Sequence, residues 1–310
     1  MAFDLSYFNV PLSNPPFQFN ACSYVQVLLQ VLSNVESPED LHSFFCTSRG
    51  AMNMAADPVL KAYWLAKHRQ SRAVDLAARK GGADVMIHLL RMGAVSATEK
   101  APYAVYHGVD YVTPIVVAVR EDLPEVVVFL LRRGDVRADV ANIASALCRA
   151  AYHNHVECLQ ALLAPDSPVN ANSLNAYGQS PLSLTAVPAY FEAAQLLLSR
   201  GAVCNVQVGY GSTLLHHVCF VSDKKAVRAQ MLGMLLDSGG DSVMNAQNDE
   251  GNTPLHCAVF HDLPECCEML LRAGAVASLS IRDRFGKTPL DAAIRDRSCQ
   301  SVLARYANNG

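Results

Sequence analysis

The segment Asp249–Ala275, "DEGNTPLHCAVFHDLPECCEMLLRAGA", has the pattern of a turn followed by two short helices. An acidic turn leads into a Thr-Pro-Leu-His start, where Thr253 can cap the first helix and Pro254 supplies a preset φ where no N–H is needed. A small residue, Ala258, lies inside the first helix, and the second helix ends before Gly274. A glycine there can adopt the left-handed conformation that closes a helix. The segment therefore predicts one helix pair with its own start and stop signals.

The same frame recurs along the chain at a nearly constant interval. A weaker copy begins at Arg72 and brings the number of copies to seven. In the six clearer copies the Thr position is occupied, at spacings of 32, 35, 33, 40 and 35 residues, by Thr113, Ser145, Ser180, Thr213, Thr253 and Thr288.

This pattern resembles the ankyrin repeat, a turn plus two antiparallel helices with a period of about 33 residues and a T-P-L-H-x-A signature. Thr253–Ala258 matches the signature residue for residue, and the resemblance covers residues 71–310. It implies an all-α solenoid of about seven repeats without an extended β-sheet, stabilised by the interfaces between neighbouring repeats. We expect the second helices to end at left-handed glycines, which are Gly93, Gly134, Gly201 and Gly274.

Two repeats depart from this frame. The third replaces its glycine cap with "APDSPVN", Ala164–Asn170, and the fifth is lengthened and contains "SDKKAVRAQ", Ser222–Gln230. We expect the second segment to lie in a lengthened connection between helices. It is interpreted as a solvated basic loop, with a dedicated contact to an acidic partner as the alternative.

Residues 21–68 predict a separate unit of three short amphipathic helices, with residues 1–20 as a flexible segment before it. Ser37–Asp40, "SPED", combines a capping serine, a proline in the first position and acidic residues at the positive end of a helix. Asp57-Pro58 opens the third helix in the same way. The apolar stripe of the first helix follows helical spacing and comprises Val25, Leu28, Leu29 and Leu32.

This unit resembles an F-box, whose run of motifs corresponds here to Leu32-Ser33, Asp40-Leu41, Ser48-Arg49 and Asp57-Pro58. The chain departs from the family pattern at two places. It has Ser23-Tyr24 where the family has its opening Leu-Pro, and Ala51 where the family has its central Trp. The resemblance implies a subunit of a Skp–cullin–F-box ubiquitin ligase that binds the adaptor through its apolar helices and the target through its repeats. The implied adaptor-binding residues are Leu28, Leu32, Pro38, Leu41 and Phe45.

The alternative is a plain ankyrin scaffold, in which these helices only cap the exposed end of the array. An array of this kind needs such a terminal cap. The two readings differ in whether residues 23–64 leave an apolar patch exposed for an adaptor.

Composition excludes several other classes. A net charge of −3 and a pI of about 6.3 give no general attraction to nucleic acid or anionic membranes. The chain lacks both an apolar run of the roughly 18–20 residues that a membrane span needs and the features of a signal peptide. The ten cysteines are scattered without a C-x-x-C pair, so we expect reduced, small apolar side chains and no zinc site. We therefore expect a monomeric protein located in the cytoplasm, with the nucleus as the alternative location.

The motifs that suggest chemistry are incomplete. Gly286-Lys287-Thr288 lacks the earlier glycine of a phosphate-binding loop, and His155-Val156-Glu157 is not followed by the cysteine pair of a zinc deaminase. We expect His216 and His256 to bond backbone between repeats. The sequence predicts no enzyme and no cofactor.

The target-binding surface is predicted from positions that the repeat does not require to be apolar. Seven residues past each Thr position, the residue after that, and the turns supply aromatic and basic side chains on the expected concave face. Aromatic residues and arginine are enriched at binding hot spots. The predicted set is Tyr111, Arg120, Tyr152, His153, Tyr177, Tyr210, Phe220, Phe260, His261, Phe285 and Arg295.

Overall fold

The computed structural model describes residues 73–105, 108–186, 188–205, 207–220, 225–293 and 297–307, and isolated positions between 58 and 66. The chain divides into two compact units between Leu130 and Leu131, called unit 1 and unit 2 below. The expected segments 1–20 and 21–68 lie outside the described residues apart from those isolated positions. So do the implied adaptor-binding residues Leu28, Leu32, Pro38, Leu41 and Phe45.

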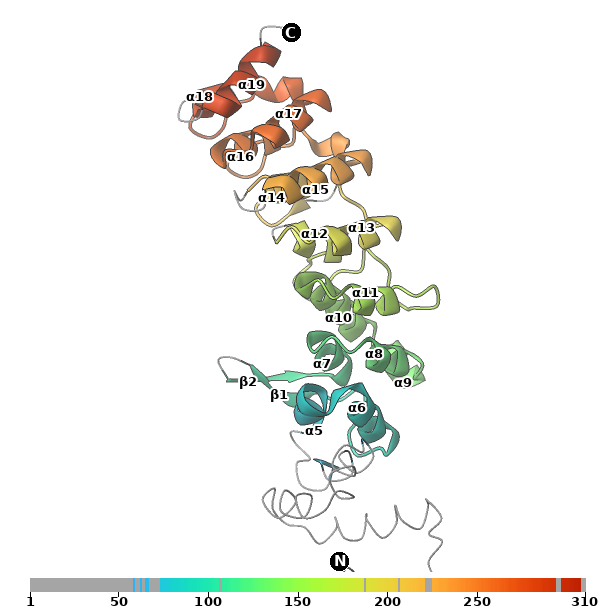
Figure 1. The fold of residues 1–310 in the computed structure, drawn as a ribbon. Helices are drawn as coiled ribbons and strands as arrows, with labels where there is room; N and C mark the ends of the chain where they lie inside the picture. Colours follow the sequence, from blue (N-terminus) through green and yellow to red (C-terminus); the bar gives the residue numbers. More distant parts are fainter. Residues whose placement is uncertain are drawn as a thin grey trace, which may run out of the picture. The chain divides into compact units, whose positions relative to one another are not determined.

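Unit 1 contains two helix pairs joined by a hairpin (Figure 1). Its elements are α5 (Ala73–Leu76), the π-helical η3 (Ala77–Gly81), α6 (Gly82–Arg91), β1 (Ala101–Val105), β2 (Gly108–Val112), α7 (Pro114–Arg120) and α8 (Pro124–Leu131), whose last residue reaches the unit boundary.

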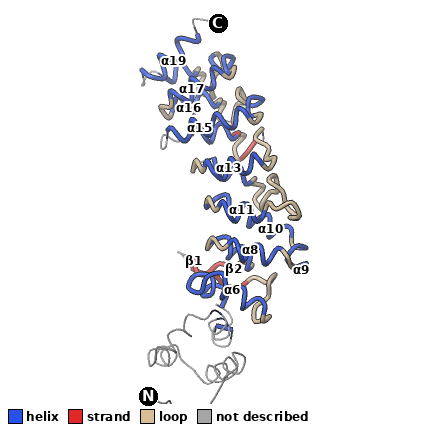
Figure 2. Tube along the Cα trace, turned by 45° about the vertical axis from the view of Figure 1, so that its right-hand side comes forward, coloured by secondary structure: helices blue, strands red, loops and turns tan. Residues whose placement is uncertain are grey.

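Unit 2 continues with short helices and turns, shown by type in Figure 2. Its elements are α9 (Gly134–Ala138), α10 (Val140–His153), α11 (Val156–Leu162), α12 (Pro181–Ala186), α13 (Phe191–Ser199), β3 (Gln207–Val208), β4 (Ser212–Thr213), α14 (Leu214–Val218), α15 (Lys225–Asp237), η4 (Gly240–Val243), α16 (Pro254–Phe260), α17 (Pro264–Arg272), η5 (Ala275–Leu279), α18 (Pro289–Ala292) and α19 (Arg297–Ala307).

The helices of unit 2 form two stacked rows. Helices α10, α12, α14, α16 and α18 contact one another in that order, and these are the inner helices. Helices α11, α13, α15, α17 and α19 do the same and are the outer helices. Each helix pair therefore packs mainly on its neighbours, and the predicted, mostly helical stack of repeats is confirmed.

The expected all-α class needs one addition. Strands β1 and β2 pair antiparallel, from Ala101 with Val112 to Val105 with Gly108, and the two-residue strands β3 and β4 form a second pair. Valine and tyrosine, which favour strands, are frequent in residues 101–112. In the described part of the chain neither pair extends into a larger sheet.

The glycine caps follow the prediction at three of four positions. Gly93, Gly201 and Gly274 have φ of +67°, +79° and +110°. Gly134 does not, because it is the first residue of α9 rather than the end of a turn. Here Arg133 serves as the extended N-cap, and its guanidinium pairs with the carboxylate of Asp135 at 2.9 Å.

The prediction of a loop was wrong for Lys225–Gln230, whereas residues 222–224 lie outside the described part of the chain. Residues from Lys225 onward are the first turns of α15, not a loop. Arg228 is only 1% exposed and donates from Nη1 to the carbonyl of Val218 at 3.1 Å. The buried positions Arg228, Met231, Leu232 and Leu235 follow helical spacing. The helical spacing of buried residues therefore continues into the basic segment, and it predicts the structure of that segment better than the charged composition does.

Leucines and small side chains make up the core between adjacent repeats. Leu162, Leu197 and Leu270 are fully buried, and Ala150 and Ala258 allow the inner helices to approach closely. All eight cysteines in the described part of the chain are free and buried, which agrees with their predicted role as small apolar residues.

Histidines at the fourth position of the helix start connect adjacent repeats. The Nδ1 of His256 accepts the backbone N–H of Thr253 at 3.2 Å, and its Nε2 lies 3.1 Å from the carbonyl oxygen of Lys287. Because a carbonyl oxygen only accepts, Nε2 carries the proton and donates it. The predicted bonding to backbone of the next repeat is confirmed.

His216 makes the same pair of contacts, with the N–H of Thr213 at 3.0 Å and the carbonyl of Asn252 at 2.8 Å. Burial lowers the pKa of His216 to about 4, and the bond to Asn252 opposes this only in part. Protonation would also place a hydrogen on Nδ1, opposite the N–H of Thr213. The fold therefore depends on the neutral imidazole.

We expect the free energy of unfolding to fall as the pH drops from 6.5 toward 4. The unfolded chain takes up a proton at His216 near its ordinary pKa of 6.5, whereas the folded chain resists it until about 4. The loss from this group at about pH 5 is about 2 kcal/mol. Urea denaturation at neutral and acidic pH measures it.

The His216→Gln variant is the matched control and should show a shallower pH dependence. Some dependence remains, because burial also lowers the pKa of His256. Equal slopes for the variant and the original chain would contradict the assignment.

Candidate protein-binding surface

Three of the five inner helices of unit 2 expose a ring at the same position of the repeat. Tyr152 lies in the last turn of α10, Phe220 follows the end of α14, and Phe260 is the last residue of α16. Their exposed fractions lie between 52% and 57%. Tyr152 meets His153 edge-on at 5.1 Å between ring centres, and Phe220 lies 5.0 Å from the ring of His261. We call these rings the helix row.

Three of the turns before the inner helices, those that precede α12, α16 and α18, share one hydrogen-bonding pattern. In each, the side-chain oxygen of the first residue accepts the backbone N–H groups two and four residues later. Asn175 does so from Tyr177 and Gln179 at 2.9 and 3.0 Å. Asn248 repeats the pattern with Glu250 and Asn252, both at 3.0 Å.

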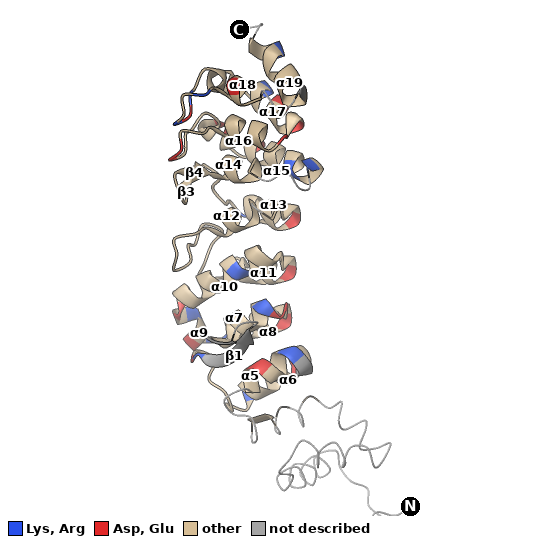
Figure 3. Ribbon diagram, turned by 90° about the vertical axis from the view of Figure 1, so that its left-hand side faces the viewer, with Lys and Arg blue, Asp and Glu red and all other residues tan. Residues whose placement is uncertain are grey.

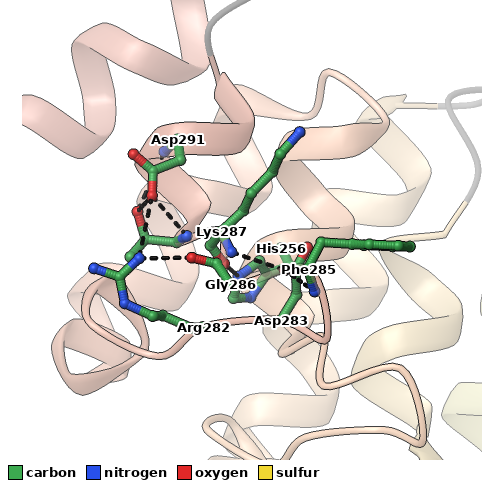
Figure 4. A network of polar contacts seen from close by, with 8 residues as sticks. His256, Arg282, Asp283, Phe285, Gly286, Lys287 and Asp291 are labelled. Carbon is green, nitrogen blue, oxygen red and sulfur yellow. Dashed lines mark hydrogen bonds and ion pairs between the residues drawn. The ribbon is translucent and has the colours of Figure 1, made fainter.

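The last turn shows the same pattern around Asp283, which accepts from Phe285 at 2.8 Å and Lys287 at 2.9 Å. Figure 4 shows the Phe285 ring pointing away from this network. The third position of these turns, immediately before a positive-φ glycine, is thus held outward by the backbone. It is occupied by Tyr177, Glu250 and Phe285.

Tyr210 occupies the corresponding place on a turn of different design. It lies between β3 and β4, and both Tyr210 and Gly211 have positive φ, +60° and +66°, as in a type I′ hairpin turn. A non-glycine residue in this region costs about 1 kcal/mol. The exposed fractions of Tyr177, Tyr210 and Phe285 are 88%, 86% and 71%. We call the third positions of the four turns the turn row.

Eight of the eleven predicted residues are in unit 2 and are described. Tyr152, His153, Tyr177, Tyr210, Phe220, Phe260 and Phe285 are exposed, and His261 is half-buried against Phe220. The backbone of Tyr111 is in β2, and the half-buried Arg120 ends α7, so both belong to unit 1. Arg295 lies outside the described residues.

The predicted set omits the charged residues at the tips of these turns, Asp249, Glu250 and Arg284. The guanidinium of Arg284 lies 4.8 Å from the centre of the Phe285 ring and 3.3 Å from the carboxylate of Glu250. Asp249 lies at the preceding tip. The sequence signal for these tips is the glycine that recurs at the fourth position of each turn, as Gly178, Gly211, Gly251 and Gly286.

The described residues contain no group of three or more His, Cys, Asp or Glu side chains placed to hold a metal ion. Nor does this part of the chain include a helix of the length and hydropathy that a membrane crossing requires. Exposed rings beside single charges can bind another chain, since aromatic residues and arginine are the usual anchors of interfaces.

Stacked helix pairs with outward turns and exposed rings define a repeat protein that binds other proteins. A family model for ankyrin repeats matches three overlapping segments, residues 115–208, 186–277 and 215–308. The chain belongs to the ankyrin-repeat family.

Several curated relatives share part of this chain. NF-kappa-B inhibitor alpha of Gallus gallus is 37% identical over 30% of this chain and 27% of its own length. Ankyrin repeat and SOCS box protein 3 of Homo sapiens is 32% identical over 58% of this chain and 34% of its own. The Arabidopsis thaliana protein named "Putative E3 ubiquitin-protein ligase XBAT31" is 31% identical over 44% and 31%. The chain thus spans about a third or less of the length of these relatives.

Alanine at Tyr152, Phe220 and Phe260 together should change the stability little. Each ring is about half exposed, and exposed substitutions usually stay within about 0.5 kcal/mol each. Thermal unfolding followed by circular dichroism tests this. The control is Leu270→Ala, a fully buried position, which should cost about 2–5 kcal/mol. A triple variant as destabilised as the control would place the rings in the core.

Proposed function

We propose that this protein recruits a target protein to a Skp–cullin–F-box ubiquitin ligase. The ankyrin repeats indicate a role in protein–protein interaction. In the proposal, unit 2 binds the target, residues 21–68 bind the adaptor, and the chain acts without catalysis of its own, as a monomer in the cytoplasm or nucleus. Eight free, buried cysteines suit a reducing compartment.

The observation that carries the target-binding half is the exposure of rings at repeated positions. Three rings of the helix row and three of the turn row are more than half exposed in unit 2. Monomeric proteins rarely leave large contiguous apolar patches open unless another molecule binds there. The repeat itself does not need these rings, because its core consists of the leucines and alanines between the helices.

The adaptor-binding half is supported by sequence. Residues 23–64 contain the F-box-like pairs Leu32-Ser33, Asp40-Leu41 and Ser48-Arg49. Among the relatives, one name joins ankyrin repeats to a SOCS box, and another names an E3 ubiquitin-protein ligase. A second named element beside ankyrin repeats is therefore found among proteins similar to this one.

Co-purification with the adaptor and the cullin tests the ligase role. The original chain should capture both, and the double variant Leu32→Asp with Leu41→Asp should capture neither, because charges would replace apolar anchors of the interface. Circular dichroism should show that the helical content of the double variant is retained.

The triple alanine variant of the helix row is the matched control and should keep adaptor capture while losing target binding. If the original chain never captures the adaptor, the ligase role is wrong, and the scaffold with capping helices is the function that remains.

A further inference from the structure

The tips of the last turns of unit 2 are linked in one row by backbone hydrogen bonds. The N–H of Asp249 donates to the carbonyl of Tyr210 at 3.1 Å, and the N–H of Arg284 donates to the carbonyl of Glu250 at 2.9 Å. Each tip therefore lies against the tip of the next repeat. In Figure 3, charged residues on the turns beside β4, α16 and α18 are confined to the last two turns.

The last tip already contains a bound arginine from its own chain. The guanidinium of Arg284 lies over the Phe285 ring, 4.8 Å from its centre, and its Nη2 is 3.3 Å from the carboxylate of Glu250. A planar guanidinium can stack on a ring and pair with a carboxylate at the same time. The last tip thus provides both an aromatic ring and a carboxylate to one arginine.

The preceding tip offers the same two groups without an arginine of its own. The Tyr210 ring is 86% exposed. The carboxylate of Asp249 lies against the next residue of the same turn, since a Cβ on Gly211 would be 2.6 Å from Oδ1 of Asp249. Within the described residues, Asp249 has no ion-pair partner.

We propose that the tip formed by Tyr210 and Asp249 binds an arginine of an extended segment of the target protein. The guanidinium lies on the Tyr210 ring and pairs with the Asp249 carboxylate, as Arg284 does with Phe285 and Glu250. The flanking rings of Tyr177 and Phe285 contact apolar side chains of the same segment. This inference rests on the proposed target binding and adds the chemistry of what is bound.

Other partners fit the row less well. The carboxylates of Asp249 and Glu250 repel phosphate, which disfavours nucleic acids and phosphopeptides. A lysine would pair with Asp249, but its compact ammonium lacks the plane that stacks on a ring. An extended segment suits a row in which each repeat contributes one tip.

Tyr210 also adopts a backbone conformation that another residue would adopt more easily. Its φ is +60°, and its turn has the type I′ form that favours Asn-Gly. Tyr210→Asn should therefore raise the melting temperature while removing the ring. A role in stability alone predicts no loss of binding from this variant.

The experiment uses the full chain, immobilised, and a phage-displayed library of random dodecapeptides. We expect the enriched peptides to contain an arginine. Citrulline, which has the shape of arginine without its charge, should weaken binding of a selected peptide on the order of tenfold or more, and lysine less. Fluorescence anisotropy with the labelled peptide measures both.

The variants assign the site. Tyr210→Asn and Asp249→Asn should each weaken binding of the selected peptide on the order of tenfold, whereas Val276→Ala, at an exposed apolar residue outside both rows, should not. Asp249→Arg should abolish binding, and a peptide with glutamate in place of the arginine should restore it.

Enriched peptides without arginine, an empty library, or binding indifferent to Tyr210→Asn and Asp249→Asn would overturn the inference. Adaptor capture by the same preparations separates it from the ligase role. If the chain captures the adaptor but binds no arginine peptide, only this inference is wrong. If it binds the arginine peptide but does not capture the adaptor, only the proposed ligase role is wrong.

Discussion

The imidazole at the start of α14 and of α16 is the contact that holds these repeats in register with their neighbours. In His256 it closes the first turn of α16 by accepting the N–H of Thr253, and it donates across the repeat boundary to Lys287. His216 does the same one repeat earlier. Since a buried polar group left without a partner costs about 1–3 kcal/mol, helix start and neighbouring turn must stay in register. One side chain thus couples the local structure of a repeat to its position on the next.

Much of this fold is visible in the sequence because the coupling requires particular residues at fixed spacing. The Thr253–His256 start, the alanine after it and the buried leucines each have one structural role, and their recurrence predicts the stacked helices. The predictions were wrong where charge or a single glycine, rather than helical periodicity, determined the expected structure. The basic residues at the start of α15 suggested a loop, yet Arg228 lies buried at a core position, with a stem that packs and a guanidinium that bonds to Val218. The glycine at position 134 predicts a helix end, but Gly134 is the first residue of another helix, α9.

The candidate surface was predictable in part for the same reason. Counting from the Thr position places Tyr152, Phe220 and Phe260 at equivalent sites, and all three rings are exposed. Their neighbours across repeats could not be counted in this way. The pairing of Glu250 with Arg284 joins residues that are far apart in the chain, and it depends on how one tip bonds to the next. Periodicity identifies which positions are equivalent, but contacts between equivalent positions require the stack itself.

The turns separate what stabilises the repeat from what it presents to a partner. In three turns an Asn or Asp side chain holds the backbone, so the third position is free to be Tyr, Glu or Phe without disturbing the stack. The turn at Tyr210 has Val208 where the other three turns have Asn or Asp, and it relies on the β3–β4 pair. Its tyrosine adopts a conformation that glycine or asparagine would adopt more easily. A cost in stability of this kind is tolerated where the rest of the structure holds the residue in place, and such residues cluster at binding sites. The position with the least structural reason to be tyrosine is also among the most exposed of the rings, so its side chain is best explained by contacts to another molecule.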